Sequence, residues 1–354
     1  MSFSFGIHHT QNSWWYDTAP MKHLLTAFLS LSFVLCAMAL HGSARAASGW
    51  LLVANKGEQT MGIIDPAASK QVAVVAEGGV TGHEVIASPD GKTAYVPIYG
   101  NSGVGKPGTD GTHLVVVDLA TKAITGQVDF GKGVRPHCPM FGPKDGLLYV
   151  TTELNNSISV IDPKTLKIVG EVPTGQPESH MLAITRDGTR GYTANVGPGT
   201  VSVLDLVARK TVSVIPISGM TQRISLAADD SMAFTADQKQ PRMAVINTKT
   251  NAVDRWITLP AIGYGTATTP DGKWLVVAMP SAAKVAVVDL KTFTVAQTID
   301  VPTAPQEVLV RPDGAMAYVS CDVSGKVAAI RTSDWKVDAL IDAGKAADGL
   351  AWAH

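Results

Sequence analysis

Three histidines occupy equivalent positions in a repeated pattern along the chain. His83, His137 and His180 each stand at the same distance before a tyrosine in a recurring phrase, whose first copy is SPDGKTAYV at 88–96. If the repeats place these positions side by side, three imidazoles converge, and they could bind a metal ion with one position left open for water or substrate. We therefore predict a transition-metal ion (zinc, copper or iron) as the candidate cofactor.

The same register marks a polar residue in every later repeat. These positions hold Gln222, Tyr264, Gln306 and Asp348. Together with the histidines they predict a ring of polar side chains around a channel mouth, with Gln222, Tyr264 and Gln306 as candidate ligand contacts. The alternative is that polar residues stand here only because the channel is filled with water.

Three carboxylates lie in or beside this ring and could serve the chemistry of a bound metal. Glu84, Glu307 and Asp348 are candidate general bases, or groups that orient the metal ligands. Arg223 is the one cation next to a ring position, and its planar guanidinium could bind a substrate carboxylate. The alternative, which we favour, is an ion pair between Arg223 and Glu84 or Glu307.

The cysteines are interpreted as structural. Cys138 directly follows His137, so in an extended strand the two side chains point to opposite faces. We expect Cys138 to pack between repeats rather than to act as a fourth metal ligand. Cys321 lies four repeats away, and no disulfide between the two is expected.

One repeat carries an extra loop at Tyr99–Thr112 (YGNSGVGKPGTDGT), and we expect it to overhang the channel mouth. Tyr99 and Asn101 are therefore candidate ligand contacts, although a tolerated surface insertion would look the same in sequence. Part of the loop matches G-x-x-x-x-G-K, but Pro107 replaces the Ser or Thr that would bind magnesium, and no helix follows. A phosphate-binding loop is rejected on these grounds.

The elements that must position these residues follow from the repeat itself. Related phrases recur with a period of about 42 residues, and each unit reads as four short apolar strands separated by Asp-Gly and Pro-rich turns. This pattern predicts a seven-bladed all-β propeller of four antiparallel strands per blade. The last blade combines one C-terminal strand with three N-terminal strands, which pairs the sheet edges that an open array of blades would leave exposed. The first strand of each blade should line the channel and begin on the face that carries the loops between second and third strands.

Two phrases carry a resemblance to a known family. YVTTELNNSISVIDPKTLKIVGEVPTGQP and GYTANVGPGTVSVLDLVARKTVSVIPI resemble the YVTN family of β-propeller repeats, which is related to lactonase-like and cytochrome-d1-like propellers. The resemblance covers the chain from about residue 47 onwards and implies the propeller fold. It says little about function, because such folds host binding proteins and enzymes alike.

The N-terminal segment is interpreted as a targeting sequence that is not part of the folded domain. Residues 1–20 read as an extension upstream of the true start, and residues 21–46 read as a secretory signal peptide with an apolar run and an Ala-Arg-Ala cleavage site. The run is short for a stable membrane span. We expect a periplasmic or secreted monomer whose single propeller domain spans 47–354.

Composition and missing motifs exclude several classes of protein. The chain has 29 Lys and Arg against 30 Asp and Glu, so it has no basic field that would attract nucleic acid. There is no C-x-x-C-H sequence for covalent haem attachment and no G-x-S-x-G nucleophile elbow.

Two functions from different classes remain. The first is binding of a small-molecule ligand or metal at the channel mouth by the three histidines, extending to metal-dependent hydrolase or lyase chemistry such as lactone opening. The alternative is a non-catalytic propeller whose rim is an interaction platform for a protein of the cell envelope.

Overall fold

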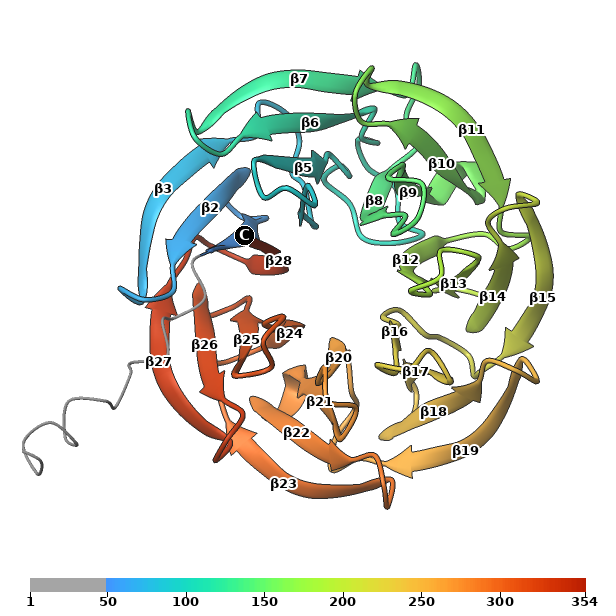
Figure 1. The fold of residues 1–354 in the computed structure, drawn as a ribbon, viewed down its shortest axis with the longest axis vertical. Coiled ribbons are helices and arrows are strands. Elements are labelled where there is room, and N and C mark those ends of the chain that lie inside the picture. The colour runs from blue at the N-terminus through green and yellow to red at the C-terminus, as the bar shows by residue number, and fades with distance from the viewer. Residues whose placement is uncertain (1–48) are drawn as a thin grey trace, which may run out of the picture. The chain divides into compact units, whose positions relative to one another are not determined.

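The computed structural model describes residues 49–354, which form seven four-stranded antiparallel sheets arranged as blades around a centre (Figure 1). The predicted seven-bladed propeller is confirmed. The expected extension at 1–20 and signal peptide at 21–46 lie outside the described residues and stay predictions. Within 49–354, no helix has the length and apolar character needed to cross a bilayer.

The strands follow the order predicted from the repeat. Blade one consists of β4 (Ile86–Ala87), β5 (Thr93–Pro97), β6 (His113–Asp118) and β7 (Ala123–Asp129). Blade two consists of β8 (Pro136–Phe141), β9 (Leu148–Thr152), β10 (Ser157–Asp162) and β11 (Lys167–Pro173). Blade three consists of β12 (Ser179–Ile184), β13 (Arg190–Asn195), β14 (Thr200–Asp205) and β15 (Lys210–Pro216). Blade four consists of β16 (Ser225–Leu226), β17 (Met232–Asp237), β18 (Arg242–Asn247) and β19 (Ala252–Thr258).

The second half of the ring has the same pattern. Blade five consists of β20 (Thr266–Thr268), β21 (Trp274–Met279), β22 (Lys284–Asp289) and β23 (Thr294–Asp300). Blade six consists of β24 (Pro305–Val310), β25 (Met316–Cys321), β26 (Lys326–Arg331) and β27 (Lys336–Asp342). Blade seven consists of β28 (Ala347–Ala353), β1 (Trp50–Asn55), β2 (Thr60–Asp65) and β3 (Lys70–Ala76). Two short 3-10 helices, η1 (Glu153–Asn155) and η2 (Pro280–Ala282), follow β9 and β21.

The Asp-Gly turns explain why the chain reverses after each inner strand. In blade five Gly272 has a φ of 70°, a left-handed conformation that glycine adopts without a steric penalty. The preceding Asp271 accepts a hydrogen bond from the backbone N–H of Lys273 at 3.1 Å, which fixes the turn. Blade four has Asp230 in place of the glycine, with a φ of 61°, and aspartate is one of the few other residues that tolerates this region.

The ring is closed by the two ends of the propeller, as the sequence predicted. β28 pairs with β1, and Leu52 lies opposite Ala351 in this ladder. Leu52 is fully buried and belongs to an apolar cluster that also contains Ala351 and residues of blade one. The closing strand pair is therefore held by hydrogen bonds and by packing against the next blade.

Shortening the buried side chain in this closing pair should destabilise the protein. We expect Leu52→Ala to lower the free energy of unfolding by about 2–5 kcal/mol, because it removes buried methyl groups and leaves a cavity. Val207→Ala is the control, since Val207 is 75% exposed, and it should change the value by less than about 0.5 kcal/mol. Urea unfolding followed by tryptophan fluorescence measures both. Equal effects of the two variants would contradict the importance of the closure.

Candidate functional site

The three histidines meet at one mouth of the central channel. The ring centroids of His137 and His180 are 3.6 Å apart, and those of His83 and His137 are 5.5 Å apart. They line a cavity of about 160 Å³ together with Gln222, Tyr264 and the loop residues Gly103 and Val104. Lys56, Arg223 and Asp348 complete its lining. We call this cavity the mouth chamber.

Burial keeps the three imidazoles neutral. It lowers the pKa of His83 to about 3, and it lowers the pKa of His137 well below its ordinary value. Burial also lowers the pKa of His180, against the opposing effect of the nearby Glu153 carboxylate. Neutral imidazole has a free lone pair on one nitrogen, which is the form that binds a metal ion or accepts a hydrogen bond.

The histidine nitrogens have few partners in the protein. Nδ1 of His137 is buried and has no hydrogen-bond partner among the described residues. Nδ1 of His180 faces Oε2 of Glu153 at 3.7 Å, while its Nε2 lies 3.3 Å from the amide nitrogen of Gln222. The 3.7 Å separation is too long for a hydrogen bond, so Nδ1 of His180, like Nδ1 of His137, is buried without a hydrogen-bond partner among the described residues.

The rings are stacked rather than aimed at one point. The planes of His137 and His180 are inclined by only 31°. A metal ion lies in the plane of each imidazole that binds it, at ~2.0–2.1 Å from the nitrogen, so nearly parallel rings cannot share an ion without rotating. Consistently, no group of three or more His, Cys, Asp or Glu side chains in residues 49–354 has the arrangement of a metal site.

Arg223 crosses the channel and binds three carboxylates from three other blades. Its Nη1 donates to Oε1 of Glu84 at 2.6 Å and also to Glu307, and its Nη2 donates to Oδ1 of Asp348 at 2.8 Å. The favoured interpretation of Arg223 as an ion-paired residue is confirmed, with one more partner than expected. The three candidate general bases are thus all engaged by one guanidinium.

The network sets the protonation of its members. Burial raises the pKa of Glu84 and of Glu307, and Arg223 offsets this only in part. Burial alone would also raise the pKa of Asp348, but Arg223 and Lys56 together hold it below its usual range. Asp348 differs because it has a second cation, Lys56, whose Nζ lies 3.0 Å from Oδ2.

A second arginine holds the extra loop over the mouth. Arg135 donates from Nε to Asp110 at 2.6 Å and from Nη2 to the carbonyl of Lys106 at 2.6 Å. Both partners belong to the loop after β5, and Gly103 and Val104 of the same loop line the mouth chamber. The loop therefore lies over the channel mouth, as the sequence predicted.

Tyr99 and Glu153 connect this loop to the histidines. Tyr99 is fully buried, stacks on His83 at 4.6 Å between ring centroids, and donates from its hydroxyl to Oε2 of Glu153 at 2.5 Å. Oε1 of Glu153 lies 3.3 Å from Nη1 of Arg135. Burial opposes ionisation of Glu153, but His180, the Tyr99 hydroxyl and the backbone N–H of Gly105 together hold its pKa below the usual range.

Three of the predicted ligand contacts, Tyr99, Asn101 and Gln306, do not line the mouth chamber, and Tyr99 is fully buried against His83 and Glu153. Gln306 lines a separate hollow with Tyr264 and Gln238 and does not line the mouth chamber. Asn101 is exposed, and its side chain accepts from the backbone N–H of Thr109 at 2.7 Å, so it stabilises the loop instead. Cys138 is buried, and both Cys138 and Cys321 are free, as expected.

Sequence reasoning missed three residues that shape the site: Lys56, Arg135 and Glu153. Lys56 and Glu153 each follow the second strand of their blade, as Tyr99 does. The signal that would have found them was the register itself, because the loops after second strands share the face of the histidine ring. Arg135 stands in the connection just before β8 and had no such signal.

The comparisons with known proteins support the fold alone. No family model matches the chain, and no curated protein matches it. A protein of unknown function from Desulfotomaculum acetoxidans is similar in structure, with 14% identity over 87% of this chain and 99% of the other, at a TM-score of 0.69. Hydrazine synthase of Kuenenia stuttgartiensis matches at 17% identity over 71% of this chain and 96% of the other, with a TM-score of 0.48. The seven-bladed β-propeller fold rests on the sheet topology of this chain, and the YVTN resemblance stays a prediction.

Removing the guanidinium should destabilise the protein in a pH-dependent way. We expect Arg223→Met to lower the free energy of unfolding by about 3–5 kcal/mol near neutral pH, because buried carboxylates lose their cation. Carboxyl groups with a raised pKa hold protons in the folded state at low pH, so the loss of the cation destabilises the folded state little there. The destabilisation grows as the pH rises through the folded pKa and the groups ionise. The deficit should therefore be larger at about pH 8 than at about pH 5.

Urea unfolding at the two pH values measures this deficit. Arg186→Met is the matched control, because Arg186 is 68% exposed in its pair with Asp230, and it should cost less than about 1 kcal/mol at either pH. A deficit for Arg223→Met that is as small as the control, or that shrinks as the pH rises, would contradict the described network.

Proposed function

We propose that this propeller binds a small ligand in the mouth chamber, and that a first-row transition-metal ion is the ligand its donors select. The observation that carries the proposal is the buried Nδ1 of His137, which has no protein partner among the described residues, beside two further neutral imidazoles. A buried nitrogen without a partner costs free energy that a bound ligand would recover. Imidazole nitrogens suit zinc, copper and iron.

The surroundings of the histidines favour a metal over a larger molecule. A cavity of about 160 Å³ is smaller than the usual pocket of a drug-sized ligand, which is roughly 300–1,000 Å³, but it admits an ion with a few waters. Glu153 stands behind His180 as carboxylates commonly stand behind metal-binding histidines, where they fix the tautomer and raise ligand basicity. Binding then requires His137 or His180 to rotate out of the stacked pair.

The proposal is limited to binding. Metal-dependent hydrolysis or lactone opening needs a base free to take a proton from water or substrate. Glu84, Glu307 and Asp348 are each engaged by Arg223, so none of the three is free for that role in this arrangement. The export of the protein rests on residues 21–46 and is part of the same proposal.

Metal titration of protein purified without an affinity tag tests the proposal. We expect about one equivalent of zinc or copper bound per chain, and roughly tenfold or greater weakening in a variant with His83, His137 and His180 all changed to Ala. His113→Ala is the matched control, because His113 lies on β6 and does not line the mouth chamber. Calorimetry and elemental analysis measure the stoichiometry.

Two outcomes would overturn the proposal. If the wild-type protein binds no metal, the metal-binding proposal is wrong, and the envelope interaction platform is the function that remains. A triple variant that keeps the full stoichiometry would place the metal elsewhere. Single His83→Ala protein serves as a second variant, because His83 is only partly buried and its loss disturbs the fold least.

A further inference from the structure

A second, larger cavity occupies the channel beyond Arg223. It has a volume of about 500 Å³ and is lined by residues that follow the ring positions along the inner strands of the blades. In blade one the lining runs from Glu84 to Ile86, directly after His83, and in blade three it runs from Met181 to Ile184, directly after His180. The cavity therefore lies on the other side of the Arg223 network, and we call it the apolar chamber.

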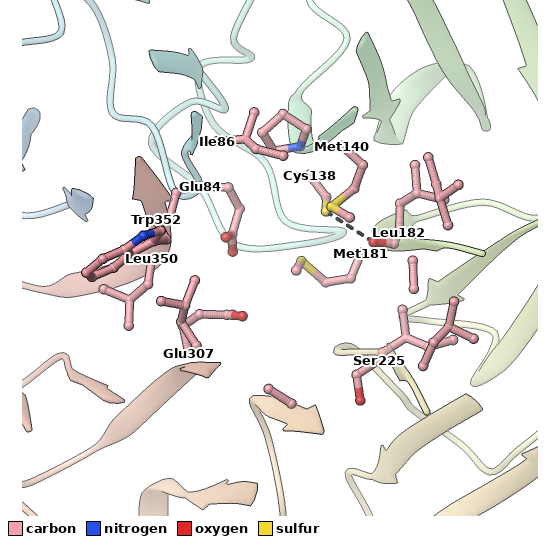
Figure 2. Close-up of a pocket in the computed structure, with 18 of the residues that line it drawn as sticks. Glu84, Ile86, Cys138, Met140, Met181, Leu182, Ser225, Glu307, Leu350 and Trp352 are labelled. Atoms are coloured by element: carbon pink, nitrogen blue, oxygen red, sulfur yellow. Dashed lines mark hydrogen bonds between the residues drawn. The ribbon is translucent and has the colours of Figure 1, made fainter. Parts of the chain in front are cut away.

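Most of the wall of this chamber is apolar. Figure 2 shows Met140 and Met181 from blades two and three, with Leu350 and Trp352 on the side of blade seven. Methionine side chains are flexible and adapt to ligands of irregular shape, and an indole offers a flat aromatic surface. The volume lies in the range of pockets that enclose small organic molecules, which is roughly 300–1,000 Å³.

The charged groups that line the chamber are two carboxyls, those of Glu84 and Glu307, and Ser225 and Thr268 add hydroxyl groups. Figure 2 shows the carboxyl groups of Glu84 and Glu307 directed into the opening. Each gives one oxygen to Arg223, and no hydrogen bond from a described residue reaches Oε2 of Glu84 or Oε1 of Glu307. Both residues line the cavity, and their side chains are 6% and 17% exposed, so a ligand in the chamber can reach the free oxygens.

The charge around these carboxyls selects the sign of a ligand. Two cations, Arg223 and Lys56, face three carboxyl groups, those of Glu84, Glu307 and Asp348, so the network carries one negative charge in excess when all three are ionised. An anionic head group would meet repulsion at the inner end of the chamber. A cationic head group would gain attraction and a charge-assisted hydrogen bond in surroundings with little water.

We propose that the apolar chamber is a second binding site, independent of the histidines, for a hydrophobic amine. The apolar body of the ligand packs against Met140, Met181 and Trp352, and its ammonium group donates to the free oxygens of Glu84 and Glu307. This proposal goes beyond the metal site, since the two cavities are separated by the side chain of Arg223.

Three probes that share a phenylalkyl group and differ in the terminal polar group test the proposal: phenylbutylamine, phenylbutanol and phenylbutyrate. Calorimetry on the whole protein should give the tightest binding for the amine, with roughly tenfold or more between amine and carboxylate. Glu307→Gln should lower the affinity for the amine by about tenfold and leave the affinity for the alcohol unchanged, because the substitution removes the charge of the side chain and keeps its shape. Gln306→Ala is the neighbouring control, since Gln306 does not line the chamber.

Two further variants locate the binding. Ala267→Trp fills the chamber and should abolish binding of all three probes, whereas the triple His83, His137 and His180 to Ala variant should keep the amine affinity. Unchanged amine affinity in the triple histidine variant shows that the amine site does not depend on the histidines, so the amine proposal and the metal proposal can fail independently. If Ala267→Trp does not fold, a crystal soaked with a bromine-labelled phenylbutylamine locates the ligand by the anomalous signal of bromine.

The results that would overturn the proposal are specific. They are absence of amine binding at millimolar concentration, equal affinity for amine and carboxylate, or bromine found outside the inner strands of the blades.

Discussion

The structure depends on one ion-pair network in the middle of the ring. Arg223 extends from blade four and contacts Glu84 of blade one, Glu307 of blade six and Asp348 of blade seven. A propeller has packing between neighbouring blades, but little directly joins blades across the channel. This guanidinium supplies that connection. A buried ion pair adds little net stability over apolar packing, yet it strongly disfavours arrangements that leave any of its charges unpaired.

The network also divides the channel into two environments. On one side, neutral histidines and polar loops enclose the small mouth chamber, and on the other, methionines and leucines line the larger apolar chamber. The two differ because the inner strands begin with polar residues at the loop face and continue with apolar ones. A single scaffold thus presents neutral imidazoles at one end and apolar surface at the other.

A second arginine links the mouth to the one irregular loop. Arg135 binds Asp110 and the carbonyl of Lys106 in this loop and also lies beside Glu153, whose carboxylate faces His180. Movement of this loop would therefore change the surroundings of the histidines.

Much of the fold could be predicted because the same local pattern of strands and turns recurs in each blade. The Asp-Gly turns, the Asp or Asn that ends six of the seven third strands, and the period were enough to place all seven blades and the closing strand pair. The register also placed the three histidines together. It could not predict that His137 and His180 stack, that Arg223 binds three carboxylates, or that Gln306 turns away. These depend on side-chain directions across a channel, which no local period encodes.

The separation of the channel by Arg223 is tested most directly by a crystal structure of the ligand-free protein near neutral pH. We expect density for the guanidinium between Glu84, Glu307 and Asp348, with two cavities that do not communicate. A guanidinium turned toward either mouth, with a continuous file of water from His83 to Trp352, would contradict it.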